Sequence, residues 1–149
     1  MMQKLLPPFL YILTLTAMIL TCWWFELSHH LVFPFNLLGL PFALSGLVLS
    51  AQAKRLFIRL ETNVMTFDKP DLLVTEGAFK HTRNPMYLGF VISLLGVCLL
   101  IGANELSWAF VVLFVVITDR WYICYEERVM QEKFGSQYAA YCRDVRRWI

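Results

Sequence analysis

The chain has 149 residues, which suits one compact domain, and 58% of them are hydrophobic while only 16% are charged. This composition is typical of a membrane protein and excludes an ordinary soluble domain. The net charge of +2 gives no sign of a nucleic-acid-binding surface. The four cysteines lack the spacing of a metal site or a disulfide framework.

Four segments without charged side chains predict four membrane-spanning helices, at about residues 5–27, 31–56, 85–103 and 106–125. About 20 apolar residues cross a bilayer core as a helix, so the first three segments are long enough. The fourth is long enough only if its helix continues through Asp119 and Arg120. Short turns join the first span to the second and the third to the fourth, which predicts two antiparallel hairpins. We therefore expect an all-α, polytopic membrane protein with residues 1–149 in a single domain.

The basic residues predict how the chain is oriented. All thirteen lysines and arginines lie before the first predicted span, between the second and third, or from the end of the fourth onward. Lysine and arginine concentrate on the cytoplasmic side of membrane proteins, so both termini are expected in the cytoplasm, at a bacterial inner membrane. The basic side would then face the headgroups of membrane lipids.

Two stretches on that side are too polar for the bilayer. One is the cytoplasmic loop 57–84, and a long loop in so small a domain is usually functional. The other is the C-terminal helical segment 126–149, in which Gly135 is predicted to end one helix. Four apolar residues then follow at helical spacing and form a single apolar stripe, as in an interfacial amphipathic helix: Tyr138, Tyr141, Val145 and Trp148.

The stretch KHTRNPMYLG, residues 80–89, stands at the start of the third predicted span. Asn84 is a favourable cap for a helix N-terminus, and Pro85 suits the first helical position. A capped helix that enters a membrane explains both residues without any chemistry. The alternative is a binding site, because a helix N-terminus beside the Arg83 guanidinium suits a carboxylate or a phosphate.

Charged residues near the end of the fourth predicted span allow two interpretations. Ionisable groups at this depth are candidates for function, but Arg120 can also extend to the headgroups while Asp119 bonds a neighbouring helix. Glu126 and Glu127 fit a solvated acidic pair at the start of a cytoplasmic helix. Beside the aromatic residues 121, 122 and 125, the same pair would also suit a cationic ligand.

Two segments together carry a family resemblance: LVTEGAFKHTRNPMYLG (73–89) and EERVMQEKFGSQYAAYCRDVRRWI (126–149). They resemble the integral-membrane methyltransferases of the isoprenylcysteine carboxyl methyltransferase and phospholipid methyltransferase group, over roughly residue 66 to the C-terminus. The family motif arginine-(histidine or asparagine)-proline-x-tyrosine-x-glycine matches residues 83–89, and its paired glutamates match residues 126 and 127. Its later phenylalanine-glycine and two tyrosines match residues 134, 135, 138 and 141.

The resemblance implies an all-helical membrane enzyme, with S-adenosyl-L-methionine entering from the cytosol and the methyl acceptor arriving from the bilayer. It implies these cofactor-binding residues: His81, Arg83, Asn84, Pro85, Tyr87, Gly89, Glu126, Glu127 and Tyr138. It implies Arg146, Glu127 and Tyr141 for the chemistry, with Arg146 orienting an acidic acceptor. No metal is implied.

The chain departs from the farnesyl-cysteine enzymes at Asn84, where they carry a histidine, and it has only two predicted spans before the motif. The acceptor therefore stays open among small or lipid-like hydrophobic carboxylates, thiols and amines, and the oligomeric state is not predicted. Two other functions compete with methyl transfer. One is a small four-helix transporter, although Glu26 lies at the end of the first span instead of its middle. The other is a non-catalytic scaffold of the same fold.

Overall fold

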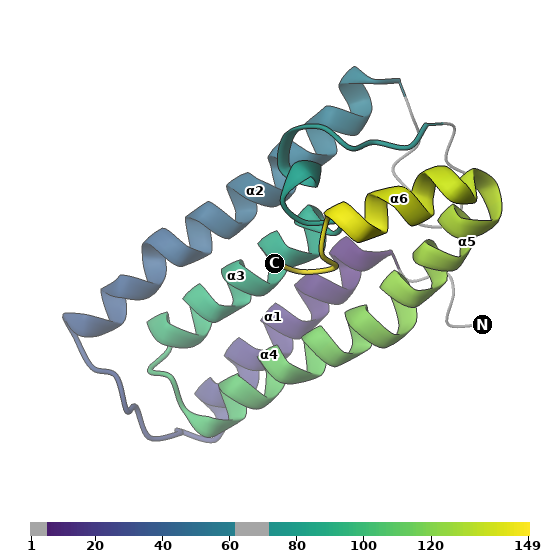
Figure 1. Ribbon diagram of the computed structural model, residues 1–149. Coiled ribbons are helices and arrows are strands. Elements are labelled where there is room, and N and C mark those ends of the chain that lie inside the picture. The colour runs from purple at the N-terminus through teal and green to yellow at the C-terminus, as the bar shows by residue number, and fades with distance from the viewer. Residues whose placement is uncertain (1–5, 62–71) are drawn as a thin grey trace.

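The computed structural model describes residues 6–61 and 72–149, and these two ranges fold into an all-helical bundle without strands (Figure 1). This confirms the predicted all-α fold. The first half contains α1 (Pro7–Trp24), the short 3-10 helix η2 (Phe35–Leu38) and α2 (Gly39–Arg59). The second half contains η3 (Gly77–Lys80), α3 (Pro85–Leu100), α4 (Glu105–Ile117), the π-helical turn η4 (Thr118–Ile123), α5 (Cys124–Phe134) and α6 (Ser136–Asp144).

Three helical stretches of the described chain are long and apolar enough to cross a membrane: Pro7–Trp24, Phe35–Arg59 and Glu105–Phe134. The last combines α4, η4 and α5, so the helix does continue through Asp119 and Arg120. The third predicted span, 85–103, is the shorter helix α3. Part of the predicted loop 57–84, residues 62–71, lies outside the described residues.

The α2 and α3 helices cross in close contact because small residues line both surfaces. On α2, Gly39, Ala43 and Gly46 are buried at helical spacing, and they face Gly89 and Gly96 of α3. A Cβ atom added at Gly46 would lie 2.9 Å from the Cα of Ser93 on α3. Small residues let helix backbones approach closely, which is a common basis of helix association in membranes.

The α3 helix lies in the middle of the bundle, with α2 on one side and α1 and α4 on the other (Figure 1). Consecutive helices α1 and α2 run antiparallel, but α3 lies between them. The main core joins α1, α3 and α4 around the fully buried Met18, Leu94 and Phe114. Tyr11 of α1 donates to or accepts from Ser93 Oγ at 2.8 Å, so its hydroxyl is paired inside this core.

The polar elements of the described chain gather at one end of the bundle. The helices α1 and α3 begin at this end, and α2 ends there (Figure 1). Here α5, the last part of the helical stretch Glu105–Phe134, extends away from the apolar core. Gly135, with a φ of 48°, turns the chain between α5 and α6. Since α6 ends at Asp144, residues 145–149 leave the helix and run back past the start of α3. This end of the bundle holds the candidate site.

Candidate active site

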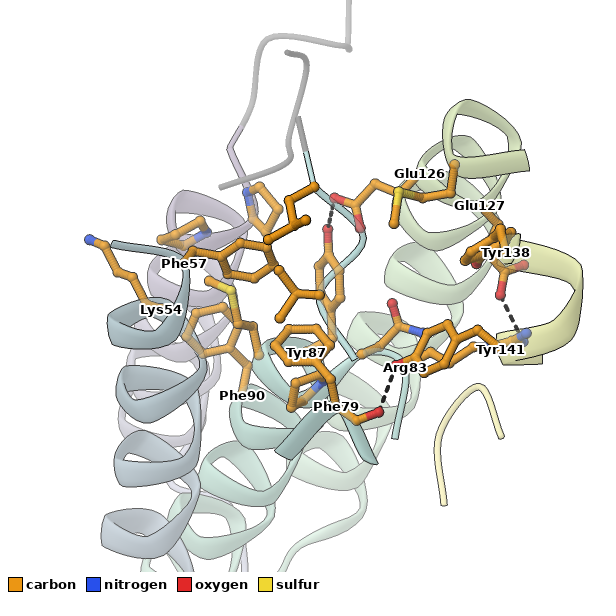
Figure 2. A pocket seen from close by; sticks show the side chains of 18 of the residues that line it. Lys54, Phe57, Phe79, Arg83, Tyr87, Phe90, Glu126, Glu127, Tyr138 and Tyr141 are labelled. Atoms are coloured by element: carbon orange, nitrogen blue, oxygen red, sulfur yellow. Dashed lines mark hydrogen bonds and ion pairs between the residues drawn. The ribbon is translucent and has the colours of Figure 1, made fainter. Parts of the chain in front are cut away.

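A pocket of about 300 Å³ opens at the polar end of the bundle, a volume in the range of small-molecule sites. Its walls come from the start of α1, the end of α2, the start of α3, α5, α6 and the segment before α3. Figure 2 shows Phe57 and Phe90 on one side and the two glutamates on the other, with Tyr87 between them. The pocket is therefore apolar on the α1 and α2 side and charged on the α5 side.

The motif segment before α3 is fixed by the C-terminal residues, which we call the tail (145–149). The Arg83 backbone amide donates to the Arg146 carbonyl at 3.0 Å. The Arg147 carbonyl accepts from Thr82 Oγ1 at 3.3 Å and from Asn84 Nδ2 at 2.9 Å. The predicted capping role of the Asn84 side chain is therefore wrong, because Asn84 occupies the cap position without capping and binds the tail instead.

Four charged side chains form a chain of alternating sign beside the pocket. Arg83 Nη2 lies 2.9 Å from Glu127 Oε1, and both side chains are largely buried, at 14% and 20% exposure. Arg147 also binds Glu127: its Nε donates to Oε1 at 3.1 Å and its Nη2 donates to Oε2. Arg147 Nη1 then reaches Asp119 Oδ1 at 3.3 Å. The hydrogen bond to Glu127 raises the pKa of the Arg147 guanidinium, so the arginine stays charged.

Asp119 lies within the π-helical turn at residues 118–123 of the helical stretch Glu105–Phe134. Such turns change the direction of the side chains that follow them and occur often at functional sites. Asp119 also accepts a hydrogen bond from Trp148 Nε1 at 2.9 Å, whereas its neighbour Arg120 is 81% exposed. The interpretation in which Asp119 bonds another segment is thus the observed one, and that segment is the tail.

Glu126 lies on the pocket wall next to Glu127 but has a different environment. Its Oε1 accepts a hydrogen bond from the Tyr87 hydroxyl at 2.8 Å (Figure 2). Within residues 6–61 and 72–149, Glu127 has two arginine partners, while no basic side chain forms an ion pair with Glu126. In the described chain, two arginines therefore neutralise the Glu127 carboxylate, whereas the Glu126 carboxylate has no cationic partner.

Two tyrosines of α6 close the pocket above Arg83. The Tyr141 hydroxyl donates to the Phe79 carbonyl at 2.7 Å, which attaches α6 to the segment before α3 (Figure 2). Burial raises the pKa of Tyr141 to about 12. Burial, together with the nearby Glu127 carboxylate, raises the pKa of Tyr138 well above its ordinary value. Both tyrosines are therefore neutral hydrogen-bond donors at physiological pH.

Most of the residues proposed from the sequence lie around the pocket, and three do not. The lining residues are Arg83, Asn84, Pro85, Tyr87, Glu126, Glu127, Tyr138 and Tyr141. His81 is exposed and does not line the pocket. Gly89 packs against Gly46 and Ser50 of α2, which makes it a helix-contact residue. Arg146 is also exposed, and the structure places Arg147 in the charged cluster instead.

Nothing in the sequence favoured Arg147 over Arg146 for the charged cluster, and nothing predicted a hydrogen-bond partner for Trp148. The helical stripe assigned Trp148 to the same face as Tyr138 and Tyr141, but the helix ends before it. Thr82 has no motif of its own, Lys54 comes from a predicted span, and Phe57 comes from the start of the predicted loop 57–84. Asp119 carried one detectable signal, an ionisable group within an apolar segment.

The donor set of the pocket suits a ligand that carries both signs of charge. Glu126 offers a carboxylate without a cation, and Arg83 Nε is a buried donor without a partner in the described chain. A buried donor left unpaired costs about 1–3 kcal/mol, so a ligand acceptor there would stabilise the site. S-Adenosyl-L-methionine, the cofactor that the sequence resemblance implies, carries groups of both signs: a cationic sulfur, an ammonium and a carboxylate.

Comparisons with known proteins point to one family. A family model described as phospholipid methyltransferase matches residues 35–137, which include the two glutamates and the motif before α3. A curated Haemophilus influenzae protein described as uncharacterized is 38% identical over 64 residues, 43% of this chain and 100% of that protein. The protein-S-isoprenylcysteine O-methyltransferase B of Arabidopsis thaliana is 36% identical over 76 residues, 49% of this chain and 36% of the plant protein. No solved structure matches the chain.

Proposed function

The chain belongs to the phospholipid methyltransferase family, and from that premise we propose that it transfers a methyl group from S-adenosyl-L-methionine to a hydrophobic acceptor. The family and the apolar helices make it a membrane methyltransferase. The cofactor, the acceptor and the cytoplasmic location of the site are the proposal. The observation that carries it is the difference between the two glutamates, because Glu126 lies on the pocket wall without a basic partner among the described residues.

The proposed cofactor site uses residues from the family motif at 83–89, from the glutamate pair and from α6. Glu126, held by the Tyr87 hydroxyl, lies where it can bind a cationic group. Arg83, whose Nε lacks a partner among the described residues, lies where it can bind a carboxylate. The aromatic rings of Tyr87 and Tyr138 on the pocket wall favour a cation or a flat base by face contact. When bound, the cofactor would supply a methyl group on a positively charged sulfur.

The role of this chain's residues in that chemistry is binding and orientation. Methyl displacement needs a collinear approach of the acceptor and gains most from positioning, for which no covalent help from the protein is required. Glu127, neutralised by two arginines, holds the Arg83 side chain, while the Arg83 backbone amide donates to the Arg146 carbonyl of the tail. Tyr141 holds α6 over the site and limits access of water from that direction.

The acceptor is proposed to be small or lipid-like and to enter on the apolar side of the pocket. Leu6 and Pro8 at the start of α1 line this side together with Phe57 of α2 and Phe90 of α3. Lys54 stands at its edge, at the polar end of α2. An acceptor with an apolar body would bury its chain here, with about 25 cal/mol gained per Å² of apolar surface. A carboxylate, thiol or amine could then reach the charged side.

The site is proposed to face the cytoplasm. Lys54, Arg83 and Arg147 all lie at the pocket end of the bundle, and the basic residues of membrane proteins concentrate on the cytoplasmic side. A transporter would need a path between the two membrane faces, whereas this pocket lies at one end. A non-catalytic scaffold of the same fold would not bind the cofactor, and the experiment below measures that binding directly.

The test uses the full chain purified in detergent. S-Adenosyl-L-methionine is titrated by calorimetry, and the protein is then incubated with methyl-labelled cofactor and a bacterial lipid extract. We expect saturable binding and label in an extractable product. Glu126→Gln should weaken cofactor binding at least tenfold, because it removes the carboxylate that is proposed to bind a cationic group of the cofactor. The control is Glu132→Gln, which changes an exposed carboxylate of the same helix. Folded wild-type protein that binds no cofactor would refute the proposal.

A further inference from the structure

The charges beside the glutamate pair do not cancel when both glutamates are ionised. Among the described residues, three carboxylates, from Asp119, Glu126 and Glu127, meet two partly or largely buried guanidinium groups, from Arg83 and Arg147. The Arg120 guanidinium also lies 3.8 Å from Asp119, but it is 81% exposed and water screens its charge. The result is one excess negative charge in a poorly solvated region. Lys54 also lines the pocket, but it extends from α2 away from the glutamates (Figure 2).

Asp119, like Arg147, is a member of this cluster that does not line the pocket. It touches Arg147 through both carboxylate oxygens, at 3.3 and 3.4 Å, and Arg147 touches the pocket residue Glu127. Without the charge of Asp119, the two arginines would balance the two glutamates. The aspartate therefore determines whether the charged end of the pocket is neutral or negative.

The two ligands of the proposed reaction differ in charge by one unit. S-Adenosyl-L-methionine carries a sulfonium, an ammonium and a carboxylate, so its net charge is positive. S-Adenosylhomocysteine, which is left after methyl transfer, has a neutral thioether and no net charge. A pocket with an excess negative charge binds the first more tightly than the second, and the interaction is strong where water is scarce.

We propose that Asp119 is a charge-setting residue that makes this pocket prefer the cationic methyl donor over its neutral product. The inference rests on the proposed function, since it concerns the same pocket. Asp119 acts through Arg147 and does not touch the ligand, so it is a positioning residue. For turnover, this preference means that the pocket attracts S-adenosylhomocysteine less strongly than the methyl donor, because the positive charge is lost with the methyl group.

The experiment compares the affinities of full-length protein variants for the two ligands by calorimetry in detergent. The measured quantity is the ratio of the dissociation constant of S-adenosylhomocysteine to that of S-adenosyl-L-methionine. Asp119→Asn keeps the size of the side chain and an acceptor for Trp148 but removes the charge. We expect it to lower the ratio on the order of tenfold, the effect of one unit charge about 12 Å from the sulfonium at an effective dielectric near 20.

Three further variants separate charge from geometry. Trp148→Phe removes the hydrogen bond to Asp119 and keeps every charge, so the ratio should change less than about twofold. Arg120→Gln removes the exposed charge next to Asp119 and should also leave the ratio nearly unchanged, because water screens it. Arg147→Gln removes a positive charge from the cluster and should raise the ratio, the opposite of Asp119→Asn.

The outcomes are distinct. If Asp119→Asn changes both affinities by the same factor, the residue is only structural and the inference fails. If Trp148→Phe lowers the ratio as much as Asp119→Asn, geometry is responsible and the inference fails again. If Asp119→Asn does not fold, Arg147→Gln decides: a raised ratio supports the inference, and an unchanged one overturns it. Wild-type protein that binds neither ligand refutes the proposed function, and the inference falls with it.

Discussion

Replacing Gly89 by alanine tests how tightly α2 and α3 pack below the pocket. The added Cβ atom would lie 2.5 Å from the Gly46 carbonyl oxygen and 2.8 Å from the Ser50 amide, and closer still to Ser50 Oγ. Non-bonded atoms prefer separations of about 3.5–4.0 Å, so the two helices must move apart by roughly 1 Å. Two of these three contacts are backbone atoms, which cannot rotate away.

Two destabilising contributions and one stabilising contribution determine how far Gly89→Ala changes the free energy of unfolding. Overpacking of this kind costs about 1–3 kcal/mol. Displacing Ser50 weakens the 2.7 Å hydrogen bond from its hydroxyl to the Met86 carbonyl, which contributes about 1 kcal/mol. Alanine is a better helix former than glycine by about 1 kcal/mol, which acts in the other direction. The sum predicts a net loss of roughly 1–3 kcal/mol for Gly89→Ala.

The assay is unfolding of the purified protein in detergent, followed by circular dichroism, with Ala51→Leu as the control. Ala51 is an exposed residue of α2, so a larger side chain there can extend away from the helix contact with α3. We expect Gly89→Ala to unfold more easily, while the folded fraction binds S-adenosyl-L-methionine with an affinity within about threefold of wild type. Wild-type stability in Gly89→Ala would refute the packing argument. Unchanged stability with lost binding would instead place Gly89 in the cofactor site.

Three other substitutions test single hydrogen bonds of the site. Tyr87→Phe removes the donor to Glu126, and calorimetry should show cofactor binding weaker by about tenfold with an unchanged helical spectrum. Asn84→Ala removes one of the two donors to the Arg147 carbonyl of the tail and leaves only the 3.3 Å bond from Thr82, so it should cost about 1 kcal/mol in detergent unfolding. Tyr141→Phe removes the donor to the Phe79 carbonyl and should cost about 1 kcal/mol at neutral pH. Because folding raises the pKa of Tyr141 to about 12, its stabilisation is complete below about pH 10 and is lost as the pH rises toward 12. Unfolding measured across that interval should therefore depend less on pH in Tyr141→Phe than in wild type.

Local patterns were sufficient for the class of fold and for the identity of most lining residues. Long uncharged runs predicted helices because a membrane helix is recognised by length and composition alone. The pairing of the motif at residues 83–89 with the glutamates at 126 and 127 indicated one site, and the structure places Arg83 against Glu127. The predicted continuation of the fourth helix is also observed, at Glu105–Phe134.

Long-range geometry decided the assignments that the sequence could not make. The position at which α6 ends determines that Arg147, and not Arg146, turns toward the glutamates, and that Trp148 leaves the apolar stripe. Two adjacent arginines look alike in a sequence, because nothing local marks which one the reversed chain will direct inward.

Asn84 and Gly89 show the same limit. Each has a sound local explanation, as a cap or as a motif glycine, yet the first binds the tail and the second packs on α2. The sequence by itself determined that the chain forms apolar helices with a polar, charged end, since composition and spacing are local properties. Only the tertiary structure decided which of those charges meet, because that depends on where helices end and how closely they cross.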